Sequence, residues 1–391
     1  MTATTTVDVD LFTDDVLDDP YPAYRALRDA GPIVWIEPQQ CWAVTRYDEV
    51  RATLEDWESF TSDQGTGLND AVNSALTGTL LASSPPLHDK LRGVLAERLS
   101  PRGLRSLGDQ ITRRTREIVE PLVERGSFDV VGDLARVLPP TIVADLVGIP
   151  DDVRPQLVPW ADAIFNMMGP ADKSRTFSGA ALVEEQFAWL ANVDGSMLTE
   201  GSWGRAIYDA AAEGRLDPEQ APTLLSAYTS AAMDTTINAL GSAVWLFAEA
   251  PAQWRRLRTD RSLIPDAFNE VLRIESPLQF FTRVATRDVD AADTRIRAGE
   301  RIMVIYGSAN RDERHWGPSA ADFEITRDAS DHLAFGYGLH GCVGQGLARL
   351  EAHAVFDTLA DLVTDFHIET PPTRHLNSAV RGLDQLTVSV R

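Results

Sequence analysis

Apolar residues recur with a helical period over most of the chain, and short strand-like stretches interrupt this pattern near both ends. From residue 89 to residue 249 Leu, Val and Ala return periodically, which predicts a run of helices. Strand-like patterns occupy residues 32–50, residues 282–300 and the terminal LTVSV. A further amphipathic helix is expected directly after Cys342. The sequence therefore predicts a mainly α fold with small peripheral β-sheets.

The longest helical candidate extends from Ala221 to Glu249 and is apolar on nearly all sides. At about 1.5 Å per residue it would span roughly 45 Å, so we expect a central, buried helix. Its middle contains Asp234, Thr235 and Thr236, although Asp and Thr are mediocre helix formers and a buried carboxylate is costly without partners. The threonines could bond to carbonyl groups one turn earlier, so the pattern alone leaves structural and functional interpretations open.

Length and charge narrow the class of protein. No repeat or linker divides the chain, so we expect one domain over residues 1–391, large enough to enclose a cofactor. The N-terminal segment lacks the regions of a signal peptide, and no run of about 18 residues is free of polar interruption. These features predict a cytoplasmic protein without a membrane span. The net charge of −22 argues against nucleic acid as a partner.

A basic island interrupts this acidic chain between residues 90 and 116. Eight basic side chains stand there against two acidic ones, Glu97 and Asp109, which gives a local net charge of +6. The basic residues are Lys90, Arg92, Arg98, Arg102, Arg105, Arg113, Arg114 and Arg116. A solvated helix face is the simplest interpretation, and a docking surface for an acidic partner is the alternative.

The two cysteines lie in different surroundings. Cys41, within QQCWAV, is expected to be a small apolar residue at the start of a strand. Both cysteines are expected to stay reduced, and neither has the companion ligands of a zinc site. Cys342 lies in FGYGLHGCVG, residues 335–344, whose first glycines form a literal GxGxxG. No buried strand precedes that motif and it stands near the C-terminus, which disfavours a dinucleotide-binding site.

A thiolate ligand for haem iron accounts for more of this segment. Such a thiolate is stabilised by backbone N–H groups in a tight turn and by the N-terminus of a following helix. Glycines at Gly336, Gly338 and Gly344 let the backbone turn sharply and approach a flat porphyrin. Phe335 could cover the sulfur, and His340 could reach a haem propionate.

With these residues identified, FGYGLHGCVG resembles the cysteine-ligand loop of the cytochrome P-450 family, whose pattern is F-G-x-G-x-H-x-C-x-G. Glu270 and Arg273 match the ExxR of the family, which on a helix forms an internal ion pair. The segment PPLHDKLR at residues 85–92 resembles PPxHxxxR, and the resemblance extends over residues 19–383. It implies a single-domain cytochrome P-450 fold with haem between a long central helix and the cysteine loop.

The resemblance also implies how haem b is held. Cys342 would be the axial ligand of the iron, and His88, Arg92 and Arg283 would bind the propionates through charge-assisted bonds. Electrons from NAD(P)H would arrive through an external ferredoxin and its reductase, because no flavin or iron–sulfur domain is recognisable. The basic island would lie on the cysteine side of the haem, where acidic ferredoxins dock in this family.

Asp234 and Thr235 resemble the acid–alcohol pair of the family, placed beside the oxygen-binding face of the haem. Splitting O2 requires protons, so Thr235 would steady the oxygen and its water while Asp234 relays protons from solvent. Family members often have glycine where this chain has Ala232, and that glycine helps to open a kink in the helix. The pair weighs against a peroxide-driven peroxygenase, whose members typically lack it.

The substrate is predicted from weaker signals. The stretches at residues 161–170, 230–245, 275–281 and 342–352 resemble bacterial members that oxidise para-substituted benzoates, notably by O-demethylation. The expected pocket residues, for which core packing is an alternative, are Phe165, Met168, Tyr228, Ala231, Leu278, Phe280 and Phe281.

Those relatives hold the substrate carboxylate from two places in the chain. There this sequence has Ala75, Leu76 and Gly78, and then Ser226-Ala227, with no arginine. A neutral phenol ether is therefore a rival to a benzoate. A non-aromatic substrate such as a terpenoid or a natural-product intermediate is a further alternative.

Overall fold

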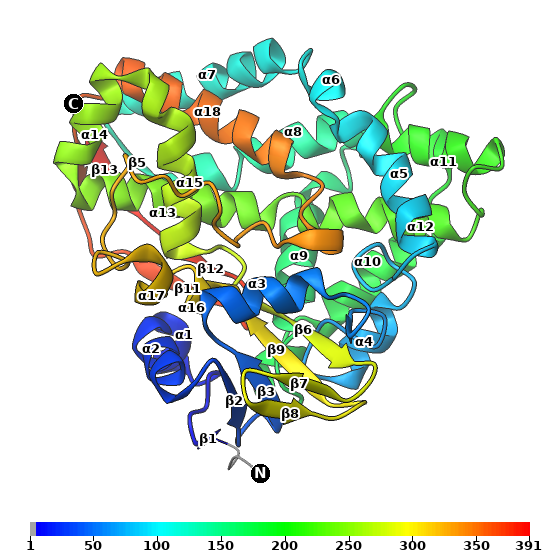
Figure 1. The fold of residues 1–391 in the computed structure, drawn as a ribbon. Helices are drawn as coiled ribbons and strands as arrows, with labels where there is room; N and C mark the ends of the chain where they lie inside the picture. The colour runs from blue at the N-terminus through cyan, green and yellow to red at the C-terminus, as the bar shows by residue number, and fades with distance from the viewer. Residues whose placement is uncertain (1–4) are drawn as a thin grey trace.

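Helices fill most of the molecule, and the largest sheet lies at the end that carries the N-terminus (Figure 1). The computed structural model describes residues 5–391, so residues 1–4 of the predicted 1–391 domain lie outside the described residues. The prediction of a mainly α fold with small peripheral sheets is confirmed. Among residues 5–391, none of the helices has the length and apolar character needed to traverse a bilayer.

Half of the α-helices in residues 5–391, α5 to α13, fall in the region where periodicity predicted a run of helices, and α18 follows Cys342 as expected. Their bounds are α1 (Asp14–Asp18), α2 (Tyr21–Ala30), α3 (Tyr47–Glu55), α4 (Asp70–Leu76), α5 (Leu87–Leu99), α6 (Pro101–Leu104), α7 (Gly108–Arg125), α8 (Leu138–Val147), α9 (Leu157–Asn166), α10 (Ala180–Asn192), α11 (Trp203–Ala212), α12 (Gln220–Ser226), α13 (Asp234–Glu249), α14 (Pro251–Thr259), α15 (Ile264–Glu275), α16 (Tyr306–Ala309), α17 (Glu313–Trp316) and α18 (Gln345–Leu362).

The main sheet has the strand order β1-β2-β3-β9-β6-β4. Its strands are β1 (Thr6–Val7), β2 (Ile33–Ile36), β3 (Cys41–Val44), β4 (Phe60–Thr61), β6 (Phe280–Ala285) and β9 (Arg301–Ile305). Because side chains alternate along a strand, Phe281 and Arg283 lie on one face of β6, and Phe280 and Thr282 lie on the other. This alternation decides which of these residues can share a site.

Three smaller pairings complete the β structure and confirm the strand predicted at the C-terminal tail. The strands β5 (Ser127–Asp129), β10 (Phe366–Ile368) and β13 (Thr387–Val390) form one sheet in the order β10-β13-β5. The others are the antiparallel pairs β7 (Val289–Ala291) with β8 (Thr294–Ile296), and β11 (Thr373–Leu376) with β12 (Arg381–Gln385).

The segment predicted as one continuous helix from Ala221 to Glu249 is divided, so that prediction is wrong in its middle. After α12 the chain forms the π-helical turn η5 (Ala227–Ala231), bends at residues 232–233 and resumes as α13 at Asp234. The hydroxyl of Thr235 donates to the carbonyl group of Ala231 at 3.5 Å, a local bond that competes with the helical ladder and bends helices. Such π turns are frequent at functional sites.

A large hydrophobic cluster joins α13 to the helix that follows Cys342. Phe247 of α13 packs against Phe356 of α18 with ring centroids 5.5 Å apart, and Phe268 of α15 contacts the same ring at 6.1 Å. All three side chains are buried. The start of α18, and with it the cysteine loop, is therefore held in a fixed position relative to the central helix.

The ExxR residues form an ion pair in the interior rather than on the surface. Glu270 and Arg273 of α15 are both 0% exposed, and their side chains meet in two bonds of 2.7 and 2.8 Å. Arg273 also donates to the carbonyl groups of Asn310 and Ala320, at 2.8 and 2.7 Å. Glu270 accepts a bond from Arg327 at 3.2 Å. The pair thus fixes residues 310–327, the segment that leads to the cysteine loop.

Replacing Glu270 by Gln is expected to destabilise the fold by about 3–5 kcal/mol, because Arg273 and Arg327 would lose their buried carboxylate. Denaturant unfolding of the holoprotein measures this loss. The matched control is Asp209→Asn, which breaks the exposed Arg205–Asp209 pair of α11 (side chains 36% and 51% exposed). That control should cost less than about 1 kcal/mol. Equal losses in the two variants would contradict a special role for the buried pair.

Candidate functional site: a haem-binding centre

Cys342 lies in a tight loop that glycine makes possible. The φ angles of Gly336 and Gly338 are 68° and 67°, in the left-handed region that favours glycine. A Cβ atom at Gly338 would lie 2.7 Å from the carbonyl oxygen of Leu54, too close for any side chain. The backbone N–H of Cys342 donates to the carbonyl of Phe335 at 2.7 Å and closes the loop.

The Cys342 sulfur lies at the N-terminus of α18, which begins at Gln345. Burial raises the pKa of the Cys342 thiol, whereas backbone N–H groups of Gly344 and Gln345 and the charge of Arg92 lower it. The positive end of the helix dipole adds to the effect of these donors. This environment suits a thiolate whose remaining charge is balanced by a metal ion.

Four cationic or potentially cationic side chains gather beside the loop. They are His88 and Arg92 of α5, Arg283 of β6 and His340 of the loop itself. The rings of His88 and His340 are 4.9 Å apart. Burial, together with the charges of Arg283, His88 and Arg92, lowers the pKa of His340 to about 3. The cluster would be stabilised by anionic groups bound among these side chains.

The contacts of these side chains leave donors free for such an anion. Asp89 occupies Nδ1 of His88 at 3.0 Å, and Nε2 of His88 is buried without a partner among the described residues. Arg283 is 3% exposed and bonds the carbonyl of its own neighbour, Thr282, at 2.8 Å. A sulfur ligand next to a cluster of donors without a counter-anion fits haem, which has an iron centre and two propionates.

Asp234 and Thr235 point in different directions at the bend between η5 and α13. Asp234 is 4% exposed, and Asn238 donates to its carboxylate at 3.5 Å. Burial and, to a smaller extent, the charge of Asp162 raise the pKa of Asp234 to about 7, against the opposing charges of His375 and Arg136. Thr235 is only half-buried and stands beside the exposed Ala231. The first residue of α13 is therefore an interior acid and the second carries a hydroxyl at the bend.

The residues predicted to line the substrate pocket fall into two groups. Ala231 is exposed, and Leu278 and Phe281 are half-buried at the junction of two hydrophobic clusters. Phe165, Met168 and Tyr228 are buried at 4%, 1% and 4% exposure. Tyr228 packs against Trp203 of α11, with ring centroids 5.8 Å apart.

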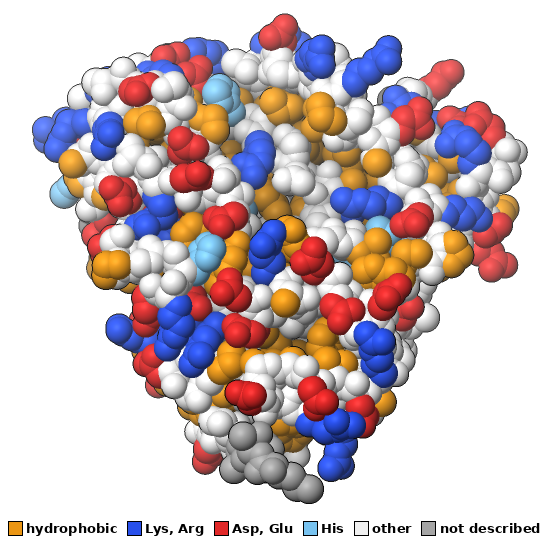
Figure 2. Space-filling view, viewed as in Figure 1, with side chains coloured by type: hydrophobic (Ala, Val, Ile, Leu, Met, Phe, Trp, Pro, Cys, Tyr) orange, Lys and Arg blue, Asp and Glu red, His pale blue; other side chains and the backbone are white. Residues whose placement is uncertain are grey.

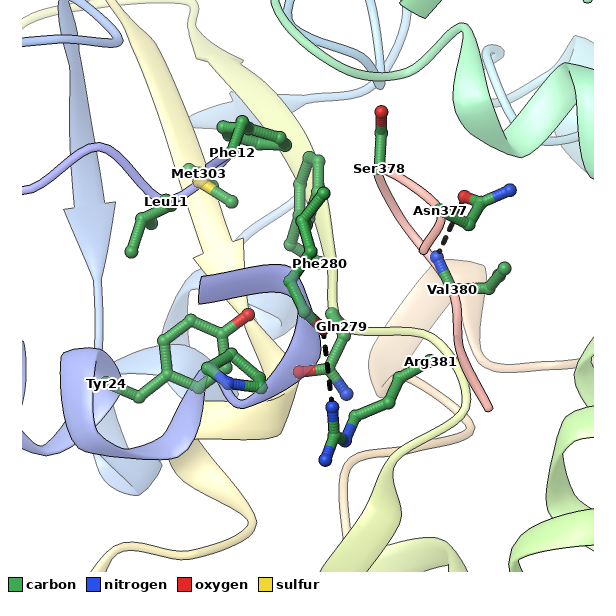
Figure 3. Close-up of a pocket in the computed structure, with 12 residues that line it drawn as sticks. Leu11, Phe12, Tyr24, Gln279, Phe280, Met303, Asn377, Ser378, Val380 and Arg381 are labelled. Atoms are coloured by element: carbon green, nitrogen blue, oxygen red, sulfur yellow. Dashed lines mark hydrogen bonds between the residues drawn. The ribbon is translucent and has the colours of Figure 1, made fainter. Parts of the chain in front are cut away.

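Phe280 lies apart from the other predicted pocket residues. Its ring packs edge-on against Phe12 at 5.7 Å, and it borders a small pocket together with Met303 and Tyr24 (Figure 3). This placement follows from the pleat of β6, which turns neighbouring side chains to opposite faces. Phe281, on the face of Arg283, is the aromatic residue of this strand that shares the face of the haem-binding cluster.

Three contacts of the site were not predicted from the sequence. Ser62 bonds Nε2 of His340 at 2.8 Å, and Arg327 joins the Glu270–Arg273 pair. His375 of β11 bonds Asp162 of α9 at 2.6 Å, close enough to Asp234 to affect its pKa. The partners lie tens to hundreds of residues apart and match no local motif.

The other cysteine and the glycine motif have structural roles. Cys41 is buried in β3, where burial raises the pKa of its thiol to about 12, and both cysteines are free. Among residues 5–391 no three His, Cys, Asp or Glu side chains form a group suited to a metal ion. The glycines of the GxGxxG lie in a loop and the 3-10 turn η7 (Gly338–His340), and no strand precedes them. The βαβ context of a dinucleotide site is therefore missing.

Comparison with known proteins places this geometry in a family. The family model described as Cytochrome P450 matches residues 206–387. The chain is 36% identical over 386 residues to cytochrome p450 CYP199A2 of Rhodopseudomonas palustris, with 98% of this chain and 93% of that protein covered.

Two solved structures share the fold. The first is P450BioI in complex with hexadec-9Z-enoic acid ligated acyl carrier protein (TM-score 0.87, 26% identity, 97% of this chain and 100% of that chain). The second is cytochrome P450 CREJ in complex with (4-ethylphenyl) dihydrogen phosphate (TM-score 0.86, 25% identity, 96% and 98% covered). The chain therefore belongs to the cytochrome P450 family and is a monooxygenase that uses haem b, O2 and electrons from external redox partners.

Proposed function

We propose that this monooxygenase inserts one oxygen atom from O2 into a small aromatic substrate, by hydroxylation or by O-demethylation of a para-substituted benzoate or a related methoxy-arene. The observation that carries the proposal is the pair of half-buried apolar side chains, Leu278 and Phe281, of which Phe281 lies on the same face of β6 as Arg283 of the haem-binding cluster. The resemblance to benzoate-oxidising members at residues 161–170 and 230–245 supports it. CREJ, a structural neighbour, was solved with a para-substituted aryl phosphate.

We assign the haem contacts as follows. Cys342 would bind the haem iron through its sulfur, and His88, Arg92, Arg283 and His340 would hold the propionates. Haem bound in this way supplies the chemistry that activates O2.

Phe335 and Gly344 protect and stabilise the sulfur. The guanidinium group of Arg349 lies 5.0 Å from the centre of the Phe335 ring, and the His332 ring lies at 5.4 Å. These contacts hold the aromatic ring in place, where it limits access of water to the thiolate. The backbone N–H of Gly344 is one of the groups that donate a hydrogen bond to the sulfur.

Replacing Cys342 by Ser is expected to abolish the far-red-shifted Soret band of the reduced carbonyl complex, because that band requires thiolate ligation. Absorption spectroscopy of the reconstituted variant measures it. Cys41→Ala, the matched change at the other cysteine, should keep the band. A band that survives in Cys342→Ser would assign the ligand to another residue.

Asp234 and Thr235 have separate parts in proton delivery. Because its pKa is about 7, Asp234 holds a proton near neutral pH and can release it, as a general acid must. The hydroxyl of Thr235, at the bend, is free to exchange its 3.5 Å bond to Ala231 for one to oxygen or to an ordered water. Asp234 thus supplies the proton and Thr235 positions its acceptor.

Two substitutions test this assignment. Asp234→Asn should slow the proton-dependent step roughly 100-fold or more, and Thr235→Ala should divert electrons to peroxide, since general acid catalysis contributes about 10²–10⁴. Product and peroxide formed per NAD(P)H report both effects. Thr236→Ala, the same change one residue later, is the control. Full coupling in both test variants would overturn the assignment.

The same acid predicts a pH dependence. Since Asp234 loses its proton above about pH 7, product formed per electron pair should fall as pH rises through that value. The Asp234→Asn variant should lack this dependence.

Faster turnover with peroxide alone than with O2 and reductant would favour the peroxygenase alternative.

Substrate titrations followed by the haem spin state test the aromatic proposal. We expect a para-methoxybenzoate or its uncharged analogues, a methoxyphenol and anisole, to shift the spin state at lower concentration than a monoterpenoid. Comparing the concentrations at which the benzoate and the uncharged ethers shift the spin state shows whether binding needs a carboxylate. A substrate site that lacks a cation should bind the benzoate no more tightly than the ethers. A response to the terpenoid alone would contradict an aromatic substrate.

The basic island is the surface that we propose for an acidic ferredoxin. It lies over α5, α6 and α7, beside α18, and several Lys and Arg side chains project from that edge (Figures 1 and 2). Contact between α6 and α18 is close, since a Cβ atom at Gly346 would lie 2.6 Å from Leu104. The island is therefore on the side of α18, the helix that follows Cys342.

Some basic side chains of the island form ion pairs within the described residues, and others do not. Lys90, Arg114 and Arg116 form ion pairs within the protein. Within residues 5–391 no ion pair involves four other exposed arginines of the island, Arg98, Arg102, Arg105 and Arg113. Exposed, unpaired cations attract an acidic protein over longer distances than paired ones do.

Reversing the charges in Arg102→Glu/Arg105→Glu is expected to slow reduction by an acidic ferredoxin roughly tenfold at low ionic strength, with a smaller difference at high salt. Stopped-flow reduction measures it. Arg25→Glu/Arg297→Glu, a double reversal at exposed positions on the opposite side near the main sheet, is the charge-matched control. Unchanged reduction kinetics in the first variant would favour the simpler interpretation of the island as a solvated helix face.

A further inference from the structure

Gln186 is a polar side chain in the middle of the buried face of α10. That face consists of Val183, Gln186 and Leu190, which are 4%, 1% and 3% exposed. The amide nitrogen Nε2 of Gln186 donates to the hydroxyl oxygens of Thr229 and Ser230, at 3.0 and 2.9 Å. Both hydroxyls belong to the π turn η5. Gln186 thus connects α10 to the point at which the central helix departs from α-helical geometry.

The orientation of the Gln186 amide follows from a second contact of Thr229. The Thr229 hydroxyl donates its hydrogen to the carbonyl of Ser226 at 3.4 Å, so it must accept the bond from Gln186. Because only the NH2 group of a glutamine amide can donate, Nε2 faces the turn. The amide oxygen Oε1 is buried and has no hydrogen-bond partner among the described residues.

This arrangement makes Gln186 a poor contributor to the stability of the fold. A buried acceptor without a partner costs free energy, which offsets what the two donated bonds contribute. A methionine of similar size would fill the same space without that cost. The amide is therefore better explained by what its two bonds hold in place.

One amide that bonds two consecutive hydroxyls favours the π turn over a regular α-helix. Consecutive side chains of an α-helix point about 100° apart around the helix axis. A π turn closes its hydrogen bonds over five residues instead of four, so it has more residues per turn and a smaller angle between neighbours. Thr229 and Ser230 can then present both hydroxyls to the single NH2 group of Gln186.

The turn that Gln186 holds ends at the residue that binds Thr235. Ala231 is the last residue of η5, and its carbonyl accepts the bond from the Thr235 hydroxyl at 3.5 Å. On its other side α10 packs against α9 through Trp189 and Trp160, whose rings are 5.7 Å apart. A continuous series of contacts therefore leads from the α9–α10 pair through Gln186 and η5 to the hydroxyl at the bend.

We propose that Gln186 is a positioning residue for the monooxygenase reaction, because its amide holds η5 in the π form and thereby fixes the place of the Thr235 hydroxyl. The inference rests on the proposed role of Thr235. Gln186 bonds the turn and not Thr235 itself, so it acts through the backbone of η5. Without its two bonds the turn can relax toward a regular α-helix, which moves the carbonyl of Ala231 and the hydroxyl bonded to it.

Carbon monoxide is a probe of this geometry that needs no turnover. The infrared C–O stretching band of the reduced carbonyl complex depends on the polar groups beside the bound gas. The band should shift in Thr235→Ala, which removes the hydroxyl, and in Gln186→Met, which displaces it. Gln253→Met is the matched control and should leave the band unmoved, since Gln253 is a half-buried residue of α14 that bonds the carbonyl of Phe323.

Thermal unfolding separates this role from a structural one. Gln186→Met should not lower the Tm of the holoprotein, because the unpaired Oε1 is removed together with the two bonds. A lower Tm with an unmoved C–O band would assign Gln186 a merely structural role and overturn the inference.

Coupling measurements complete the test. Product formed per NAD(P)H, with the methoxy-arene that shifts the haem spin state as substrate, should fall severalfold in Gln186→Met. The double variant Gln186→Met/Thr235→Ala should match Thr235→Ala alone in coupling and in the C–O band, since changes that act through one hydroxyl are not additive. Thr229→Val/Ser230→Ala removes the two acceptors and should reproduce the effects of Gln186→Met. That variant keeps the inference testable if Gln186→Met does not fold.

The failure of this inference can be told apart from the failure of the proposed role of Thr235. Full coupling and an unmoved band in Gln186→Met, with Thr235→Ala impaired, would overturn the positioning role alone. A loss in Gln186→Met that adds in full to that of Thr235→Ala would do the same. Full coupling in Thr235→Ala would overturn the positioning role and the proposed role of Thr235 together.

Discussion

The structure depends on keeping one sulfur atom charged inside a folded protein. Burial opposes the charge on Cys342, and the fold answers with backbone N–H groups from Gly344 and Gln345, the start of α18 and the charge of Arg92. These donors work only if the loop is held rigidly. The buried Glu270–Arg273 pair and the aromatic cluster around Phe356 provide that rigidity, the first from the preceding segment and the second from the following helix. Elements distant in sequence therefore serve one electrostatic requirement.

The sequence was informative wherever the chemistry is local. A glycine-lined cysteine loop, a helix after it, and Glu and Arg three residues apart are local patterns, so the fold class and the family could be predicted from them. The break after Ala231 was not predicted, because the apolar pattern continues through it, although the bond from Thr235 to a carbonyl group one turn earlier was anticipated. The same holds for the pair of His375 and Asp162, which lie 213 residues apart.

Fold similarity says little about the substrate. P450BioI and CREJ match this chain with TM-scores of 0.87 and 0.86, although one was solved with a fatty acid on acyl carrier protein and the other with an aryl phosphate. The discrimination must therefore come from a few side chains on a shared scaffold. In this chain the alternation of β6 limits the choice: Phe281 shares a face with Arg283, and Phe280 packs with Phe12 in the core. A single strand thus places one of two adjacent aromatics on the face of the haem-binding cluster and the other in the core.

Burial raises the pKa of both Cys342 and Asp234, but it hinders the chemistry proposed for the first and helps that proposed for the second. At Cys342 burial opposes the thiolate form that would bind haem iron, and backbone N–H groups and Arg92 reduce that effect, whereas at Asp234 burial raises the pKa to about 7 and helps to retain a proton near neutral pH. The π turn η5 ends just before Asp234, the first residue of α13, which is buried, while the hydroxyl of Thr235 stays at the bend and bonds the carbonyl of Ala231. The departure from a regular helix therefore coincides with a buried acid and a half-buried hydroxyl at adjacent positions in the chain.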